Sequence, residues 1–258
     1  MPLVKLPGVY GPQDDSDLLA SALRRERLPA GARALELGTG TGFLALVALE
    51  AGAAHVTAVD RSRRAVWTAR LNAQLARRHH RLDVVHGDLL DLLPPPSTPL
   101  TAAGTAGTRG TRPAAARPGQ AAATAGGRLR RRYDLVLANP PYVPAPDRDA
   151  TPRRARAWDA GPDGRAVLDR LCAAAPALLG PRGVLLLVHS EIAAPDRTLA
   201  QLTEAGLDAG IVARRLVPFG PVLRSRADWL VTRGMVSPGQ DAEELVVVRA
   251  GRPPEQAA

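Results

Sequence analysis

A glycine-rich turn between two apolar segments constrains the fold more than any other feature of this sequence. Residues 34–37 form a short apolar strand pattern, glycines follow at Gly38, Gly40 and Gly42, and residues 43–50 form an apolar helix pattern. Alternate glycines allow a sharp turn and let a ligand approach the backbone at the start of a helix. This unit predicts an α/β protein whose first strand ends at a ligand site.

The alternation of strand and helix patterns continues along the chain. Further strands are expected at residues 55–60, 82–86, 133–138, 184–188, 211–217 and 245–248, and helices at 17–28, 63–78, 165–179 and 197–205. Ser16 and Ser62 are expected to cap the helices at 17–28 and 63–78, and residues 224–229 to lie in a loop or short helix. The pattern predicts a doubly wound, mostly parallel seven-stranded α/β sheet of the Rossmann-like class, built as one domain over residues 1–258.

The positive charge of the chain is concentrated in residues 94–132. This stretch contains no acidic residue and supplies +7 of the formal net charge of +9, which leaves a difference of +2 for the remainder. It is rich in Pro, Ala, Gly and Thr without periodicity, so it cannot bury enough apolar surface to offset chain entropy. We expect a disordered insertion here, with a nucleic-acid tether as the alternative. A nearly neutral remainder disfavours a phosphate-binding surface.

Several classes of protein are disfavoured by the sequence. The N-terminus resembles no export signal, and the longest apolar run, residues 43–49, is too short to cross a membrane. We therefore expect a cytoplasmic protein. The single cysteine, Cys172, excludes an internal disulfide and is expected to be an inert buried thiol. His79 and His80 lack accompanying ligands, so no metal site is expected.

A second motif, Asn139-Pro140-Pro141-Tyr142, follows the fourth expected strand. A carboxamide or exocyclic amino nitrogen is a poor nucleophile because its lone pair is delocalised. The Asn139 side-chain oxygen and the Pro140 carbonyl could accept its two hydrogens, orient the lone pair and stabilise the developing charge. Tyr142 would offer a flat face for stacking. If strands one and four flank the point where chain order reverses, this motif faces the glycine-rich turn.

The residues around the glycine-rich turn favour an adenosyl cofactor with a methionine moiety. Glu36 precedes the first glycine by two residues, where a carboxylate would meet the positive α-amino group of that moiety. Asp60, at the end of the second expected strand, can bind ribose hydroxyls, and Asp88, after the third, can accept from the adenine amino group. A dinucleotide is the competing interpretation, because residues 40–45 also fit its looser glycine pattern.

The motifs at residues 35–42, Asp60, Asp88 and 139–142 resemble those of the HemK-type protein N5-glutamine methyltransferases, which methylate the Gly-Gly-Gln glutamine of peptide chain release factors. Residues 9–16 are similar to the opening of the short eukaryotic and archaeal branch, and residues 158–165 to a loop that borders the substrate pocket. The resemblance implies S-adenosylmethionine as cofactor, bound by Ser16, Glu36, Gly38, Gly40, Asp60, Asp88, Leu89 and Asn139. It implies substrate binding by Asn139, Pro140, Pro141 and Tyr142, of which Asn139, Pro140 and Tyr142 are catalytic.

The resemblance also implies partners and leaves alternatives open. A release factor is the expected protein substrate, and the short eukaryotic enzymes work with a small zinc-containing activator subunit. Typical bacterial members carry an N-terminal helical domain, whereas only one short helix is expected here before the first strand. The Asn-Pro-Pro-Tyr motif also occurs in enzymes that methylate adenine N6 or guanine N2 in nucleic acids, and a non-catalytic cofactor-binding module is the other rival. Trp67 is expected to pack against the sheet. Asp14, Asp15 and Asp17 are expected to interact favourably with the positive end of the first helix dipole.

Overall fold

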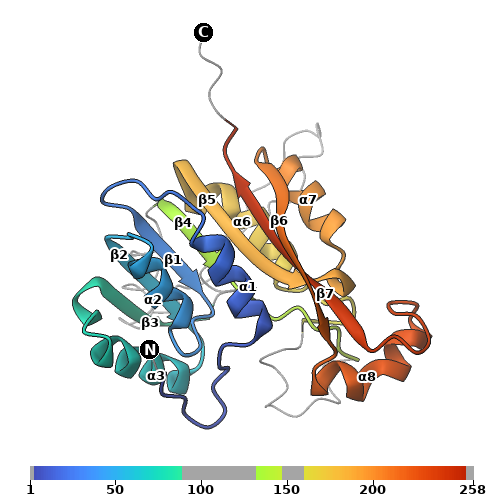
Figure 1. The fold of residues 1–258 in the computed structure, drawn as a ribbon. Coiled ribbons are helices and arrows are strands. Elements are labelled where there is room, and N and C mark those ends of the chain that lie inside the picture. Colours follow the sequence, from blue (N-terminus) through green and yellow to red (C-terminus); the bar gives the residue numbers. More distant parts are fainter. Residues whose placement is uncertain (1–2, 89–131, 147–159, 254–258) are drawn as a thin grey trace, which may run out of the picture.

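A seven-stranded sheet with helices on both faces forms the centre of the molecule (Figure 1). The computed structural model describes residues 3–88, 132–146 and 160–253. The strands are β1 (Arg33–Leu37), β2 (His55–Asp60), β3 (Leu82–His86), β4 (Tyr133–Ala138), β5 (Leu179–Ser190), β6 (Asp208–Pro218) and β7 (Ala242–Gly251). The described α-helices are α1 (Asp14–Leu23), α2 (Phe43–Glu50), α3 (Arg63–Leu75), α6 (Leu168–Leu178), α7 (Pro195–Glu204) and α8 (Pro221–Thr232).

The strand order confirms the predicted doubly wound sheet. It runs β3-β2-β1-β4-β5-β7-β6, with parallel pairing from β3 to β5 and antiparallel pairing of β7 with both β5 and β6. The chain therefore reverses direction across the sheet between β1 and β4. Because Leu37 pairs with Ala138, the residues that follow, Gly38 and Asn139, leave the sheet side by side.

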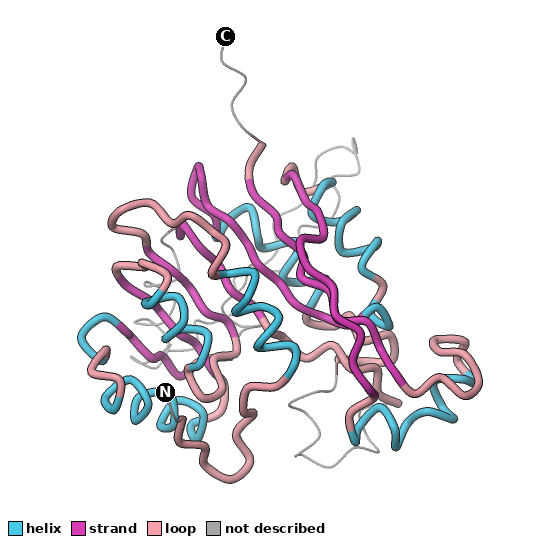
Figure 2. The backbone as a smooth tube through the Cα atoms, viewed as in Figure 1, coloured by secondary structure: helices cyan, strands magenta, loops and turns pink. Residues whose placement is uncertain are grey.

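Figure 2 shows helices on both sides of the sheet. Two apolar cores fill the space between the sheet and these helices. Leu135 and Leu137 of β4 join α1, α2 and α3 on one face. Val136 and Ala138 join α6 on the other, where Cys172 is fully buried. Burial raises the pKa of this thiol to about 11, in agreement with the expected inert cysteine. The continuous apolar run of β4 thus follows from burial on both faces.

Element boundaries differ from the sequence prediction at both helix and strand ends; β5, for example, begins at Leu179 instead of residue 184, and α1 ends at Leu23 instead of residue 28. Helix α1 begins at Asp14, with Gln13 in extended conformation as its N-cap, so Ser16 lies inside the helix and is not its cap. The prediction was wrong here because it started the helix at Asp17 and left Asp14 and Asp15 outside it, although acidic residues favour the positive end of a helix. Ser62 does cap α3, since its Oγ accepts from the Ala65 amide at 3.3 Å.

Helix α8 is the element that the sequence indicated least clearly. It spans twelve residues and, with Val143 and Phe219, encloses a small third apolar cluster through Leu223 and Leu230. Within the described ranges, no helix combines the length and apolar character that crossing a membrane requires.

Candidate active site

Two loops that are distant in sequence meet where the sheet reverses its strand order. The glycine turn, residues 38–42, follows β1, and the acceptor loop, residues 139–145, follows β4. A Cβ atom added at Gly38 would lie 3.8 Å from the Asn139 carbonyl oxygen. One pocket that opens to solvent lies here, and it is lined by Tyr10, Pro12, Ser16, Glu36, Gly38, Thr39, Gly40, Thr41, Phe43, Leu44 and Asn139.

The glycine turn depends on backbone conformations that other residues rarely adopt. Gly38, Gly40 and Gly42 have φ values of 80°, 53° and 82°. Space is also restricted, because a Cβ at Gly40 would lie 3.0 Å from the carbonyl oxygen of Tyr10. The segment before α1 therefore lies directly over the turn and forms one wall of the cavity. The glycines serve close approach of the backbone, as predicted.

Glu36 places a buried carboxylate in the lining of this cavity. Its side chain is 2% exposed, accepts a hydrogen bond from the Thr39 hydroxyl and is also stabilised by the backbone amide of Ala45. Burial nevertheless raises the pKa of Glu36 to about 8, and the neighbouring Asp60 adds to this rise. A buried carboxylate of this kind is stabilised by a positive ligand group such as an ammonium.

Asp60 supports the turn from the end of β2. One of its carboxylate oxygens accepts from the Gly40 amide at 2.9 Å and the other from the Ser62 amide at 2.8 Å. Burial raises the pKa of Asp60, although these two bonds, Arg61 and His86 oppose the rise. Each oxygen keeps a second lone pair for a ribose hydroxyl.

The adenine end of the predicted cofactor site is described only in part. Asp88 follows β3 and is half-buried, and the preceding Gly87 amide donates to the Asp60 carbonyl at 3.0 Å. Leu89 lies outside the described residues. The cofactor contacts assigned to Asp60, Asp88 and Leu89 therefore stay predictions.

The acceptor loop is held by Ser16, which the sequence predicted to bind the cofactor, and by Asp15, which the sequence did not single out as a site residue. The Asn139 Nδ2 atom donates to Ser16 Oγ at 3.3 Å. Asp15, which is 4% exposed, accepts from the hydroxyl groups of Tyr142 at 3.2 Å and Tyr10 at 2.6 Å. No periodic pattern marks Asp15, because in sequence it is one of three similar acidic residues in the first turn of α1.

Tyr142 was predicted to stack on the substrate, but its surroundings are mainly apolar side chains of the protein. Its half-buried ring packs against all three apolar clusters, and burial together with Asp15 holds the pKa of its hydroxyl well above the usual value. Pro140 is buried and Pro141 is half-buried beside it. Substrate stacking on Tyr142 stays a prediction.

A second loop, residues 160–165, packs against the acceptor loop. The Ala145 amide donates to the Gly161 carbonyl at 2.9 Å, and the Ala160 amide donates to the Val143 carbonyl at 3.2 Å. Gly164 has φ of 75°, and a Cβ there would collide with the Tyr142 carbonyl oxygen. Residues 158 and 159 of the segment that resembles a substrate-pocket loop lie outside the described residues, but its second half does border the predicted catalytic motif.

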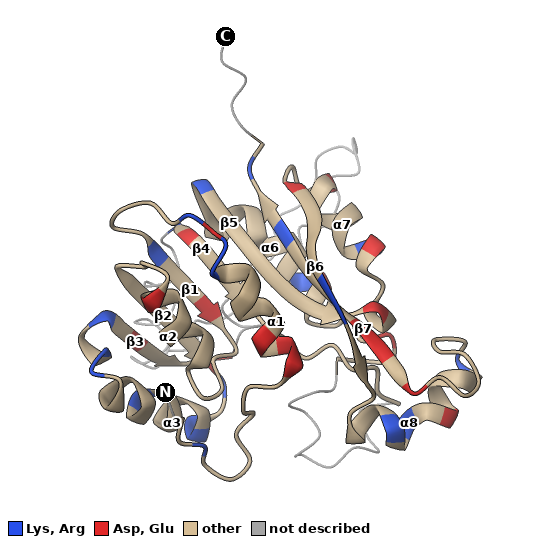
Figure 3. Ribbon diagram, viewed as in Figure 1, with Lys and Arg blue, Asp and Glu red and all other residues tan. Residues whose placement is uncertain are grey.

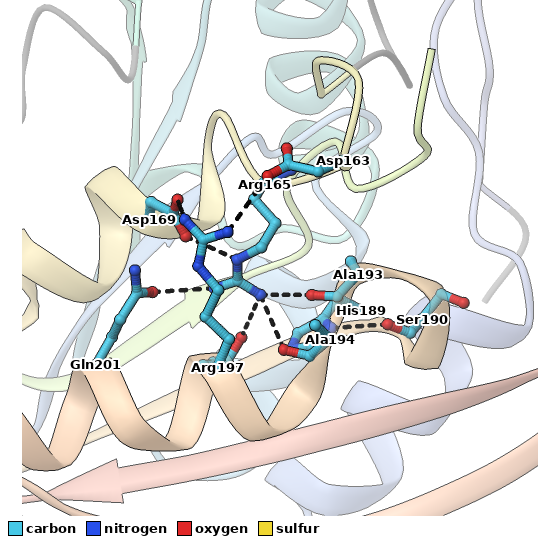
Figure 4. A network of polar contacts seen from close by, with 10 residues as sticks. Asp163, Arg165, Asp169, His189, Ser190, Ala193, Ala194, Arg197 and Gln201 are labelled. Atoms are coloured by element: carbon cyan, nitrogen blue, oxygen red, sulfur yellow. Dashed lines mark hydrogen bonds and ion pairs between the residues drawn. The ribbon is translucent and has the colours of Figure 1, made fainter. Parts of the chain in front are cut away.

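Arg165 anchors this second loop from below (Figure 4). Arg165 as a whole is 1% exposed. Its guanidinium binds the Asp169 carboxylate at 2.7 Å. The same group donates to the carbonyls of Ala193 and Ala194, to Thr198 and to Gln201. The end of the loop is thereby joined to α6, to the 3₁₀ turn after β5 (Glu191–Ala193) and to α7.

Charged side chains of both signs are distributed over the described elements (Figure 3). Arginines of β6 and β7 form ion pairs, among them Arg214 with Glu244, Arg215 with Asp14 and Arg249 with Glu26. Such pairing does not favour a phosphate-binding surface on these strands. The arginine-rich residues 94–131 lie outside the described residues.

The position of Trp67 differs from the predicted one. It is 68% exposed on α3 instead of packing against the sheet. Leu71 and Leu75 follow at four-residue intervals on the same side of the helix and are also exposed. We call these three residues the α3 apolar stripe.

Comparisons with known proteins indicate a methyltransferase. The family model of the methyltransferase small domain matches residues 1–97. A candidate protein N5-glutamine methyltransferase of Methanocaldococcus jannaschii is 27% identical over 83% of this chain and 88% of its own length. The release factor glutamine methyltransferase of Bordetella pertussis is 31% identical over 78% of this chain, which spans only 63% of that relative.

A solved structure shows the same fold. The Mtq2–Trm112 complex of E. cuniculi contains a chain that matches 95% of this one and 99% of its own length, with a TM-score of 0.53 and 22% identity. The fold and the cofactor class thus agree with the sequence prediction, and the dinucleotide interpretation is set aside. These findings indicate an S-adenosylmethionine-dependent methyltransferase that is similar to the protein N5-glutamine methyltransferases of the HemK type.

Proposed function

We propose that this protein methylates the side-chain amide nitrogen of a glutamine in the Gly-Gly-Gln motif of a peptide chain release factor. The observation that carries the proposal is that Glu36 and Asn139 line one cavity. The Glu36 carboxylate, which suits the ammonium group of the cofactor, and the Asn139 carboxamide, which suits a planar nitrogen of the substrate, thus lie at the same pocket. The names of the similar proteins support a glutamine as the acceptor.

The chemistry asked of this chain is mainly positioning. When bound, S-adenosylmethionine supplies a sulfonium methyl group, which is a strong electrophile. Asn139 Oδ1 and the Pro140 carbonyl would accept the two amide hydrogens of the glutamine and direct its lone pair toward that methyl. The amide nitrogen gains the methyl carbon while the C–S bond breaks to leave a thioether, and one proton leaves the nitrogen. No strong base is required, because an alkylated amide nitrogen is acidic.

The direct test is methyl transfer with a labelled cofactor and a purified release factor. We expect one methyl group on the glutamine of the Gly-Gly-Gln motif, located by mass spectrometry of the digested product. A release factor with this glutamine replaced by alanine is the matched control and should carry no label. Label at the same level in both proteins would contradict the proposal.

The nucleic-acid alternative is tested in parallel by offering total RNA and DNA. Since the relatives named above modify protein, we expect label only in protein. Deletion of residues 94–132 should then leave transfer to the release factor intact. Label in nucleic acid that disappears with this deletion would favour an adenine or guanine methyltransferase. Cofactor binding without transfer to any of these substrates would favour the non-catalytic module.

A small partner subunit is the second part of the proposal. It is supported by the similar chain that was solved as a complex with Trm112, and by the α3 apolar stripe, whose residues are 68%, 38% and 53% exposed. An exposed patch of this kind is typical of an interface. A cytoplasmic location, where release factors act, fits the same proposal.

The partner is tested by size-exclusion chromatography with a purified Trm112-type subunit. We expect a complex that is lost when Trp67 and Leu75 are both replaced by serine. Leu216→Ser is the control, because Leu216 is 73% exposed on β6, outside the stripe. A complex that survives the double substitution would place the partner elsewhere on the surface. If the unmodified protein forms no complex, the proposed partner subunit is wrong.

A further inference from the structure

Asp15 stands at the centre of a buried hydrogen-bond network beside the reacting loop. One carboxylate oxygen accepts from the hydroxyls of Tyr10 and Tyr142. The other accepts from the Ser16 backbone amide at 2.5 Å and from Ser16 Oγ at 3.1 Å. Ser16 Oγ in turn accepts from Asn139 Nδ2 at 3.3 Å. A single acidic side chain thus connects the segment before α1, the first turn of α1 and the acceptor loop.

The order of donors and acceptors in this network fixes the orientation of the Asn139 amide. An ionised carboxylate only accepts hydrogen bonds, so a hydroxyl that binds it has its single proton committed. Ser16 Oγ can therefore offer only lone pairs to its other neighbours. Of the two ends of the Asn139 carboxamide, only the NH₂ end can bind such a lone pair, and Oδ1 then points away from Ser16.

We propose that Asp15 is a positioning residue that acts through Ser16 to hold Asn139 with its acceptor oxygen available to the substrate nitrogen. Resting on the proposed function, this inference explains why a buried acid lies beside a loop that needs an acceptor. A carboxamide with the opposite orientation would present NH₂ to the NH₂ of a glutamine, and the two donors could not bind. Burial strengthens the selection, because a mismatched donor pair in a dry site is costly.

The chain offers a direct spectroscopic test because Asn72 and Asn139 are its only asparagines. Selective ¹⁵N labelling of asparagine therefore gives two side-chain NH₂ signals, which Asn139→Asp assigns. Asn72 is an internal reference, since its Nδ2 donates to the Val4 and Thr41 carbonyls, at 2.9 Å in each case. We expect the Asn139 signal to shift in Asp15→Asn and in Ser16→Ala, and the Asn72 signal to stay in place.

The same variants are then compared in turnover. Asp15→Asn should lower kcat by roughly 10- to 100-fold, the size expected for loss of a charge-assisted hydrogen bond, while the cofactor Kd stays within about threefold. Ser16→Thr keeps the hydroxyl and should restore most of the turnover that Ser16→Ala loses. Asp17→Asn changes an exposed acid of the same helical turn and should behave like the unmodified protein.

Two outcomes would overturn the inference. One is an Asn139 signal that is identical in the unmodified protein, Asp15→Asn and Ser16→Ala. The other is an equal shift of the Asn72 signal, which would indicate a general rearrangement. If the unmodified protein methylates no Gly-Gly-Gln protein, the proposed function is wrong, whereas the two NH₂ signals still decide the role of Asp15.

Discussion

The two halves of the active site are built in different ways. The cofactor half is formed by residues close in sequence, from Glu36 to Ser62, and uses positive φ angles and backbone amides. The acceptor half, residues 139–145, is held by groups from three distant places: the side chains of Asp15 and Ser16 in α1, the backbone of Ala160 and Gly161 in the second loop, and the side chain of Arg226 in α8. The cofactor half is therefore a local structure, and the acceptor half depends on the completed tertiary fold.

This difference has a consequence for how each half responds to change. A local turn loses its shape when a glycine acquires a side chain, but its neighbours in sequence still bring the cofactor residues together. The acceptor loop has no such local constraint, so loss of a distant anchor can move Asn139 relative to the cofactor. The following substitutions separate the two kinds of construction, from the largest expected effect to the smallest.

Replacing Arg165 with methionine should have the largest effect. The substitution removes the buried guanidinium that donates to the carbonyls of Ala193 and Ala194 and forms an ion pair with Asp169. We expect the free energy of unfolding to fall by about 3–5 kcal/mol, measured by urea denaturation. Arg197→Met is the control, because Arg197 binds the same Asp169 from a half-exposed position and should cost about 1 kcal/mol or less. Equal losses would show that Arg165 is no special anchor.

Replacing Asn139 with alanine should abolish most turnover and leave cofactor binding almost intact. Removal of one preorganised group that stabilises developing charge costs about 10²- to 10³-fold in kcat. Single-turnover methyl transfer and calorimetric titration of the cofactor product measure the two quantities separately. A proportional loss of cofactor affinity would mean that Asn139 serves the cofactor half instead.

Replacing Glu36 with glutamine should weaken cofactor binding and remove its pH dependence. Burial raises the pKa of Glu36 from 4.5 to about 8, so an ammonium ligand, which binds the ionised form, must displace a proton below that pH. Affinity should therefore rise about tenfold per pH unit up to pH 8 and then level off. Calorimetry in buffers of different ionisation enthalpy reports the released proton. An unchanged pH profile in Glu36→Gln would assign that proton to another group, such as Asp60.

The same pKa shift affects the stability of the cofactor-free protein. A carboxyl group whose pKa is raised on folding stabilises the fold below pH 4.5, and this contribution is lost as the pH rises through 8. Saturating cofactor should remove most of this loss. Thermal unfolding at several pH values, with and without cofactor, checks the sign.

Replacing Gly40 with alanine should have the smallest effect of these changes. The substitution forces alanine into φ of 53° and brings its Cβ to 3.0 Å from the Tyr10 carbonyl oxygen, which we expect to cost about 1–3 kcal/mol. Gly31→Ala is the control, since Gly31 has φ of 78° but nothing within 4 Å of an added Cβ. The difference between the two gives the cost of the close approach alone. Equal losses of stability in Gly40→Ala and Gly31→Ala would mean that the segment before α1 moves away from the added Cβ at little cost in free energy.

The sequence predicted the cofactor half better than the acceptor half, and the construction explains why. Gly38 to Gly42 and Glu36 form a contiguous motif whose chemistry can be read directly, and the paired strands made the meeting with Asn139 predictable. Asp15 could not be distinguished from Asp14 and Asp17, because only the tertiary fold buries one of the three. Helix α8 was unclear for the same reason, since its contacts with the acceptor loop are long-range.

The position of β7 has a consequence for biosynthesis. This strand lies between β5 and β6 although it follows both in sequence, so the interior of the sheet is completed only after β6 has been synthesised. Until residues 242–251 emerge, β5 presents an unpaired edge and β6 has no neighbouring strand. A chain interrupted before this point is left with two exposed edges, which favour aggregation over partial activity.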